Sequence, residues 1–221
     1  MVDASLQRKN MVESQVRPND ITDRRIIRAM SAIPREQFLP PALRAIAYMD
    51  EDVRLSDEDP NGRAMMAPRT FAKLIQLADI QPTDIVLDVG TATGYSAAIL
   101  ASLCETVVAL EADADMATTA TKLVESLSID NVVVVQGDLE VGYADEGPFD
   151  AIVVEGTIAR VPDAILDQLK DGGRLVAVLN DGVVSHATVW QRIGAKFNDR
   201  TAFECHAPEL PGFGKTAVFS L

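Results

Sequence analysis

The sequence predicts an α/β fold: a doubly wound, mostly parallel sheet that ends in antiparallel strands and follows a helical N-terminal extension. From residue 84 onward, short runs rich in Val, Ile and Leu alternate with helical segments, which is typical of a parallel sheet buried on both faces. Near the C-terminus, three strand-like runs are joined by short loops, which favours antiparallel strands. With 221 residues, of which 48% are apolar and 24% charged, the chain can form one globular unit with a full core.

The N-terminal part is predicted to be helical. Apolar residues recur with helical spacing from Ile26 to Ile33, and Pro34 ends that pattern. A second helix is expected over residues 40–48, since proline is tolerated in a first turn. A loop over residues 50–62 and an amphipathic helix over residues 69–79 follow. We therefore divide the chain into a helical extension, residues 1–62, and one globular domain, residues 63–221.

The later elements follow from apolar runs separated by helical patterns. The parallel strands are expected at 84–89, 106–111, 131–135, 149–154 and 174–179, with helices at about 94–104, 115–127 and 162–169. The C-terminal strands are expected at 186–193, 201–206 and 216–221.

The net charge of −13 is unevenly distributed. Residues 1–49 carry +3 and the remainder −16, and no Lys or Arg occurs between Lys73 and Lys122. A surface of this sign repels phosphates, and no basic stripe is present, so nucleic acid is not an expected partner. A small or cationic ligand, or a peptide, is compatible with this charge.

Cysteine usage and hydropathy favour a cytoplasmic protein. Cys104 and Cys205 lie far apart in apolar stretches, outside any CxxC or Cys/His cluster, so we expect free thiols and no metal site. No run resembles a signal peptide or reaches transmembrane length, so no membrane contact is expected. The sequence leaves the oligomeric state open.

A glycine loop follows the first predicted parallel strand, in the stretch Val86-Leu87-Asp88-Val89-Gly90-Thr91-Ala92-Thr93-Gly94-Tyr95. Gly90 and Gly94 permit close approach of a ligand to the backbone, and a helix starts after them. A dinucleotide fingerprint requires glycines where Ala92 and Tyr95 stand, which argues against a pyrophosphate ligand. The alternative is a tight strand-to-helix turn without a ligand.

Four acidic residues end successive parallel strands: Asp88, Glu111, Asp138 and Glu155. Open α/β sheets bind ligands at this edge. Asp88 suits an ammonium group, Glu111 the two hydroxyls of a ribose, and Asp138 an adenine amino group with Leu139 packed on the ring. Taken singly, Glu111 could be a solvated strand-end charge and Asp138 a turn residue. Their agreement favours a nucleoside ligand.

Together these features resemble a class I S-adenosylmethionine-dependent methyltransferase with a Rossmann-like sheet, and more closely the protein-L-isoaspartate (D-aspartate) O-methyltransferase family. The glycine loop resembles that family's cofactor motif, and other stretches along nearly the whole chain are similar to it. These are Met11–Arg17 with Ile21–Asp23, Ile33–Pro40 with Ala47–Asp50, Gly147–Ile152, and Gln168–Leu175.

The resemblance implies methyl transfer from S-adenosyl-L-methionine to the side-chain carboxylate of an isoaspartyl residue in a peptide or protein. A carboxylate is already ionised at neutral pH, so no general base is expected; His186 and His206 are interpreted as structural. The implied cofactor-binding residues are Asp88, Gly90, Thr91, Ala92, Thr93, Gly94, Glu111, Asp138, Leu139 and Glu155. The implied substrate-binding residues are Met65, Met66, Ala67 and Pro68.

The sequence departs from the family pattern mainly in its substrate half. Ala64 and Met66 stand where the family has a threonine and a serine, Leu139 replaces a glycine, and Glu155 stands among residues that are usually small and uncharged. A lost hydroxyl can remove a substrate hydrogen bond, although Met66 could equally be packing on the next helix. Two alternatives therefore remain beside isoaspartyl methylation: a methyltransferase with another acceptor, and a cofactor-binding protein without turnover.

Overall fold

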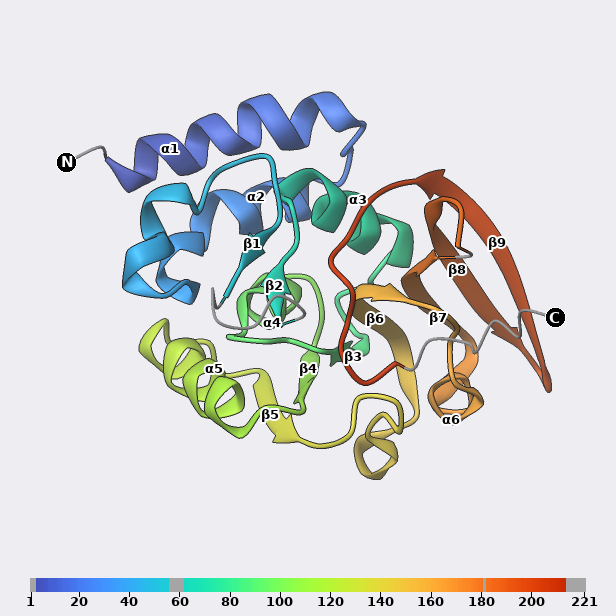
Figure 1. Cartoon of the computed structure of the whole chain (residues 1–221). Coiled ribbons are helices and arrows are strands. Elements are labelled where there is room, and N and C mark those ends of the chain that lie inside the picture. Colours follow the sequence, from blue (N-terminus) through green and yellow to red (C-terminus); the bar gives the residue numbers. More distant parts are fainter. Residues whose placement is uncertain (1–2, 56–61, 181, 214–221) are drawn as a thin grey trace, which may run out of the picture.

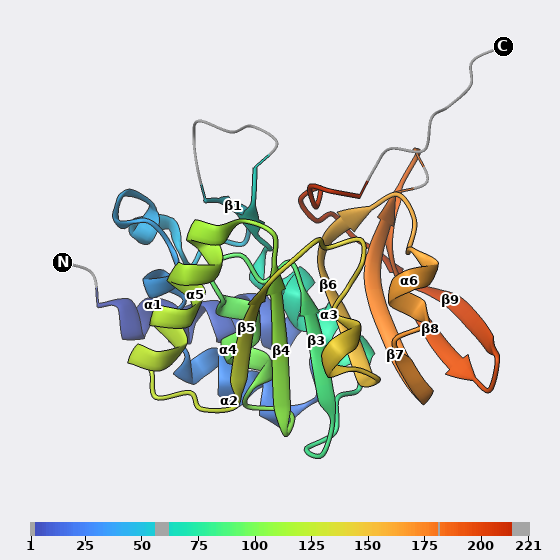
Figure 2. The same ribbon diagram turned by 90° about the horizontal axis from the view of Figure 1, so that it is seen from below.

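A computed structural model describes residues 3–55, 62–180 and 182–213 of the chain. Within them, the main sheet has seven strands in the order β5-β4-β3-β6-β7-β8-β9, which lie side by side in Figure 2. Strands β5 to β7 pair in parallel, while β8 and β9 add on in antiparallel fashion. The predicted fold class is confirmed. The strands are β3 (Ile85–Val89), β4 (Thr106–Glu111), β5 (Val132–Gln136), β6 (Phe149–Ile158), β7 (Leu169–Asn180), β8 (Ser185–Ile193) and β9 (Lys196–Glu204).

The observed helices lie where the sequence pattern predicts helices, but several are shorter than predicted. They are α1 (Ala4–Met11), α2 (Arg24–Ala32), α3 (Pro68–Ala78), α4 (Tyr95–Leu100), α5 (Ala114–Ser126) and α6 (Asp163–Leu166). The helix expected over 40–48 is a 3-10 helix, Pro41–Ile46, because Leu43 N–H donates to the carbonyl of Pro40 with i to i+3 spacing. The strand expected over 216–221 lies outside the described residues.

Side chains on the two faces of the sheet belong to two separate apolar clusters. On β3, Val86 faces one cluster and Leu87 the other, as the alternation of a strand requires. Helices α1 to α5 contribute apolar residues to the first cluster, and α6 packs in the second. Figure 1 shows α1, α2 and α3 together on one side of the sheet and α6 on the other. The near-continuous apolar strands are therefore buried on both faces.

The strand order reverses between β3 and β6. The chain runs from β3 outward to β4 and β5, then returns to place β6 beside β3, with Asp88 opposite Val153 in the register. In open α/β sheets, a ligand binds outside the carboxyl ends of the strands at this reversal. Gly90 follows β3 directly, and Glu155 lies in β6 one residue beyond the paired stretch. The topology thus brings these two segments to one crevice.

The N-terminal extension is joined to the sheet domain by a small antiparallel pair, β1 (Val53–Arg54) with β2 (Ala64–Met65). Strand β1 lies inside the segment expected to be a loop, so that expectation was wrong at these residues. The pair spans the proposed division after residue 62, which stays a prediction. In the part of the chain that the structure describes, no helix has the length and apolar character needed to cross a bilayer.

Candidate cofactor and acceptor site

The loop after β3 turns on two glycines with different roles. Gly90 has φ +86°, and a Cβ built there would lie 2.8 Å from Leu210 Cδ1 and 2.9 Å from Arg63 Nη2. Gly94 has φ +94°, and its Cβ would lie 3.0 Å from the Cβ of Ala120 on α5. Gly94 therefore permits helix packing. Gly90 permits other groups to reach the backbone at the carboxyl end of the sheet.

The carboxylate of Glu111 is held at the end of β4 by backbone donors. Its Oε2 accepts the N–H of Ala92 at 2.7 Å, and its Oε1 accepts those of Ala112 and Asp113 at 2.9 and 3.1 Å. Oε2 also accepts Arg63 Nη2 at 3.0 Å. The residue is 1% exposed. The strand-end charge is thus a buried, fixed acceptor, and the alternative of a solvated carboxylate is ruled out for this structure.

Asp88 is completely buried beneath the glycine loop. Ser96 Oγ donates to its Oδ2 at 2.7 Å, whereas Oδ1 has no hydrogen-bond partner among the described residues. Burial raises the pKa of Asp88 to about 6, although hydrogen bonds from Ser96 and Thr91 and the charge of Arg63 act in the opposite direction. Asp88 is therefore ionised at neutral pH and carries an unsatisfied acceptor.

Replacing Asp88 by asparagine is expected to change how stability depends on pH. The pKa of Asp88 is 3.8 in its ordinary state and about 6 in the fold, so the folded protein binds this proton more tightly. The wild-type free energy of unfolding therefore loses this contribution as pH rises from about 4 to 6. Relative to wild type, Asp88→Asn should gain up to about 3 kcal/mol between pH 4 and pH 7.

Denaturant unfolding at a series of pH values measures this difference. Asp130→Asn, which removes an exposed aspartate, is the control. A constant difference between Asp88→Asn and wild type across this range would show that the Asp88 proton is not coupled to folding.

The other acidic residues occupy different environments. Glu155 is partly buried in β6, and its Oε1 has no partner in the described part of the chain. Burial, and then the charge of Asp88, hold the pKa of Glu155 well above its ordinary value. Asp138 is exposed and its Oδ1 accepts the N–H of Glu140 at 3.0 Å, while Leu139 is buried. The structure therefore brings Asp88, Glu111 and Glu155 together around the loop and leaves Asp138 at the rim.

The threonines of the loop are both hydrogen-bonded. Thr93 Oγ1 donates to the carbonyl of Phe38 at 2.6 Å, and Thr91 Oγ1 lies 3.3 Å from Ser96 Oγ. The first contact ties the loop to the N-terminal extension, and the second supports the residue that binds Asp88.

The four residues predicted to bind the substrate, Met65, Met66, Ala67 and Pro68, are all buried. Both methionines belong to the apolar core and also line a cavity of about 20 Å³ beside Gly90 and Glu155. The carbonyl of Met66 accepts Arg35 Nη2 at 2.7 Å, and Arg35 Nε donates to the carbonyl of Ala47. The completely buried Arg35 thus fixes this loop against the extension.

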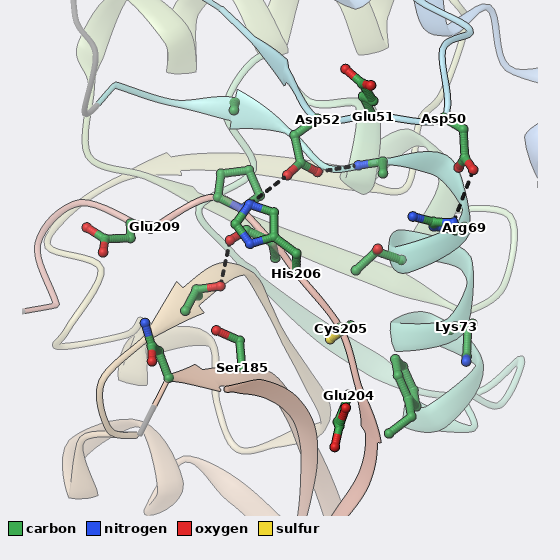
Figure 3. Close-up of a pocket in the computed structure, with 18 of the residues that line it drawn as sticks. Asp50, Glu51, Asp52, Arg69, Lys73, Ser185, Glu204, Cys205, His206 and Glu209 are labelled. Atoms are coloured by element: carbon green, nitrogen blue, oxygen red, sulfur yellow. Dashed lines mark hydrogen bonds and ion pairs between the residues drawn. The ribbon is translucent and has the colours of Figure 1, made fainter. Parts of the chain in front are cut away.

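A second cavity, of about 940 Å³, also has Ala64 of β2 in its lining. Figure 3 shows acidic residues from the segment before β1, Arg69 and Lys73 on α3, and Glu204 at the end of β9 with residues after it around the cavity. Asp50 pairs with Arg69 at 3.3 Å, and the ammonium of Lys73 lies over the ring of Phe203. Ala64 lines both cavities. This large polar cleft therefore adjoins the glycine loop through β2.

The histidines stand apart from the loop. His206 is 85% exposed in its side chain and lies 3.6 Å from Asp52, while His186 pairs within the β7–β8–β9 sheet. Asp52, which lines the same cleft as His206, accepts the N–H of Ala67 at 2.7 Å, directly before α3.

Several residues of this site were missed from the sequence. Arg63 and Leu210 cover Gly90, and Arg35 and Asp52 hold the substrate loop. One signal was present: no basic residue occurs between Lys73 and Lys122, so cations that pair with the buried strand-end acids must come from other segments. The sequence did not indicate which segment supplies them.

Comparison with known proteins places this arrangement in a family. Residues 6–206 match the family Protein-L-isoaspartate(D-aspartate) O-methyltransferase (PCMT). The chain is 38% identical to protein-L-isoaspartate O-methyltransferase of Koribacter versatilis over 172 residues, which cover 78% of this chain and 76% of that protein. It is 34% identical to the protein of that name from Herpetosiphon aurantiacus over 208 residues, or 94% and 91% of the two chains.

Solved structures agree in fold. A protein-L-isoaspartate O-methyltransferase structure superposes with a TM-score of 0.82 at 25% identity, covering 94% of this chain and 67% of that one. A Plasmodium falciparum structure assigned to the same family, in complex with S-adenosyl-L-homocysteine, has a TM-score of 0.78 at 21% identity and covers 93% and 98%. At that identity, the second comparison supports the fold alone.

Proposed function

Because the chain belongs to the protein-L-isoaspartate (D-aspartate) O-methyltransferase family, we propose that it methylates the side-chain carboxylate of L-isoaspartyl residues in peptides or proteins. The methyl donor is S-adenosyl-L-methionine. The single observation that carries the proposal is the family match over residues 6–206. The match includes the N-terminal extension, which lies outside the cofactor motif that many methyltransferases share, and is therefore more specific than that motif.

The residues at the carboxyl edge of the sheet fit this cofactor. Gly90 has no side chain to block close approach to its backbone, where Arg63 now lies. The fixed Glu111 carboxylate is proposed to accept the ribose hydroxyls, and the unsatisfied Oδ1 of Asp88 to accept an ammonium group. Asp138 and Leu139 are proposed to meet the adenine. When bound, the cofactor supplies an electrophilic methyl group on a sulfonium.

Catalysis by this chain is proposed to rest on positioning. The acceptor carboxylate is ionised at neutral pH and needs no base, so the protein has only to align and desolvate it. The cleft beside Arg69 and Lys73 is proposed to take the peptide, with Ala64 at the junction with the cofactor side. Because the pKa of Glu155 is held high, Glu155 is protonated to higher pH than usual, which reduces its repulsion of an anionic acceptor.

A direct assay separates this proposal from its alternatives. Incubated with labelled S-adenosyl-L-methionine and an isoaspartyl peptide, the protein is expected to form a base-labile methyl ester, and the matching aspartyl peptide should stay unlabelled. Cofactor binding by calorimetry without transfer to the isoaspartyl peptide would instead indicate another acceptor or a protein without turnover. Absence of cofactor binding would contradict the methyltransferase assignment itself.

A further inference from the structure

Arg63 occupies the position from which a ligand would reach Gly90. Its side chain is 8% exposed, and Nη2 donates to the Gly90 carbonyl and to Glu111 Oε2. A Cβ on Gly90 would lie 2.9 and 3.0 Å from Nη2 and Nη1. The space that glycine leaves open is therefore filled by this guanidinium, and the nearby cavity has a volume of only about 20 Å³. A nucleoside cofactor needs several hundred Å³.

Glu111 has no spare acceptor capacity while Arg63 is bound. A carboxylate offers about four lone-pair positions. Three backbone N–H groups, from Ala92, Ala112 and Asp113, and Arg63 Nη2 already donate to it. The backbone donors are fixed by the loop. A ribose hydroxyl can therefore donate a hydrogen bond to Glu111 only when the Arg63 guanidinium moves away.

Replacing Arg63 by the cofactor at Glu111 leaves the net charge around the buried acidic residues unchanged. Arg63 is attracted by Glu111, Glu155 and Asp88, three acidic residues around one guanidinium. S-adenosyl-L-methionine carries a net positive charge at neutral pH, because its sulfonium and ammonium outweigh its carboxylate. One cation thus replaces another among the same carboxylates, and the buried acids are not left without a counter-charge.

The guanidinium also has donors that the free protein does not use. Arg63 Nε and Nη1 are buried without a hydrogen-bond partner among the described residues, although a guanidinium has five N–H groups in a fork that matches a carboxylate. Arg63 directly precedes Ala64–Met66, where the family hydroxyls are missing. Ala64 lines the large cleft as well as the small cavity, so this segment borders both.

We propose that Arg63 is an acceptor-binding residue that Glu111 holds until the cofactor ribose takes its place. The released guanidinium then pairs with the acceptor carboxylate and replaces the hydroxyl that is absent at Met66. This inference rests on the proposed function for the identity of the two ligands. On this proposal, the cofactor and Arg63 compete for Glu111. Cofactor binding also releases Arg63 to bind the acceptor carboxylate.

Arg63→Met separates the two roles. Calorimetry should show that S-adenosyl-L-homocysteine binds about fivefold or more tightly to Arg63→Met than to wild type, because the competitor is gone. In steady-state assays, the KM for an isoaspartyl peptide should rise about tenfold or more with a smaller change in kcat, because a buried charge-assisted hydrogen bond is lost. Thermal unfolding confirms that each variant is folded.

Three further variants sharpen the test. Arg63→Lys keeps the charge but cannot bridge Gly90 and Glu111 with one planar fork. The changes in S-adenosyl-L-homocysteine affinity and in peptide KM should therefore have the same direction as in Arg63→Met and a smaller size. If Arg63→Met does not fold, Arg63→Lys replaces it in the test. Met66→Ser in the Arg63→Met background should recover part of the KM. Arg28→Met, on the exposed side of α2, should leave both values unchanged.

The outcomes decide between explanations. If Arg63→Met binds S-adenosyl-L-homocysteine as wild type does or more weakly, Arg63 does not compete and the proposal is overturned. An unchanged peptide KM overturns it equally. If wild type itself does not bind S-adenosyl-L-homocysteine, the cofactor assignment fails. If wild type binds it but does not methylate the peptide, the acceptor assignment fails, and the calorimetric comparison still decides whether Arg63 competes at Glu111.

Discussion

Gly90→Ala is expected to weaken S-adenosyl-L-methionine binding by about 100-fold, one of two large effects expected in the cofactor half of the site. The new Cβ would lie 2.8 Å from Leu210 Cδ1 and 2.9 to 3.0 Å from the Arg63 guanidinium, so the ends of both side chains would have to shift. It would also occupy the space through which the cofactor is proposed to approach the Gly90 backbone. Calorimetry with S-adenosyl-L-methionine measures the loss.

Gly172→Ala is the matched control for this prediction. Gly172 has φ +82°, nearly that of Gly90, but a Cβ there would meet nothing within 4 Å. Both variants carry the cost of a left-handed alanine, about 1 to 2 kcal/mol of stability, and only Gly90→Ala adds the close contact. Equal cofactor affinity in the two variants would show that the approach to Gly90 is not needed for binding.

Glu111→Gln is expected to weaken cofactor binding by a similar factor, about 100-fold, and to lower the free energy of unfolding by about 2 kcal/mol. A glutamine has one carbonyl oxygen where Glu111 uses two, and its NH₂ group would face either the Ala92 N–H or those of Ala112 and Asp113. At least one buried donor then has no acceptor. The ribose also loses the charged acceptor that is proposed for its hydroxyls.

Asp115→Asn is the control for Glu111→Gln, because Asp115 is an exposed acidic residue in the first turn of α5, close to Glu111 in sequence. Binding is measured by calorimetry and stability by denaturant unfolding. If Glu111→Gln loses stability but keeps its cofactor affinity, Glu111 is a structural residue of the loop and the ribose contact must be assigned elsewhere.

Local pattern predicted the strands well and the helices less well. The run Ile85–Val89 is apolar except for Asp88, because both faces of β3 are buried, so the sequence of that strand largely reveals its environment. The helix over 40–48 became a 3-10 helix at Pro41–Ile46. Strands β1 and β2 have two residues each, too few to produce an alternating pattern. Their stability comes from each other and from the core.

The candidate site was predictable only in part, because the sequence indicates which residues lie at the edge of the sheet but not which segments cover them. The glycine loop and the acids at the strand ends follow from chain order, because successive parallel strands end at one edge of the sheet. Asp138 and Glu155 show the limit of that argument. Asp138 follows β5 and is exposed, whereas Glu155 lies inside β6, which runs on to Ile158, and is shielded at Oε1. Strand order does not specify what covers each position.

The sequence by itself determined the fold class, the family and the set of acidic residues at the carboxyl edge of the sheet, because each is written in a contiguous motif or a local periodicity. The tertiary structure alone decided that Arg63, 48 residues from Glu111 along the chain, donates to it, and that Leu210 covers Gly90. It also decided the raised pKa of Asp88. These features depend on which segments, distant in the sequence, pack together and exclude water, and a local sequence pattern does not predict such packing.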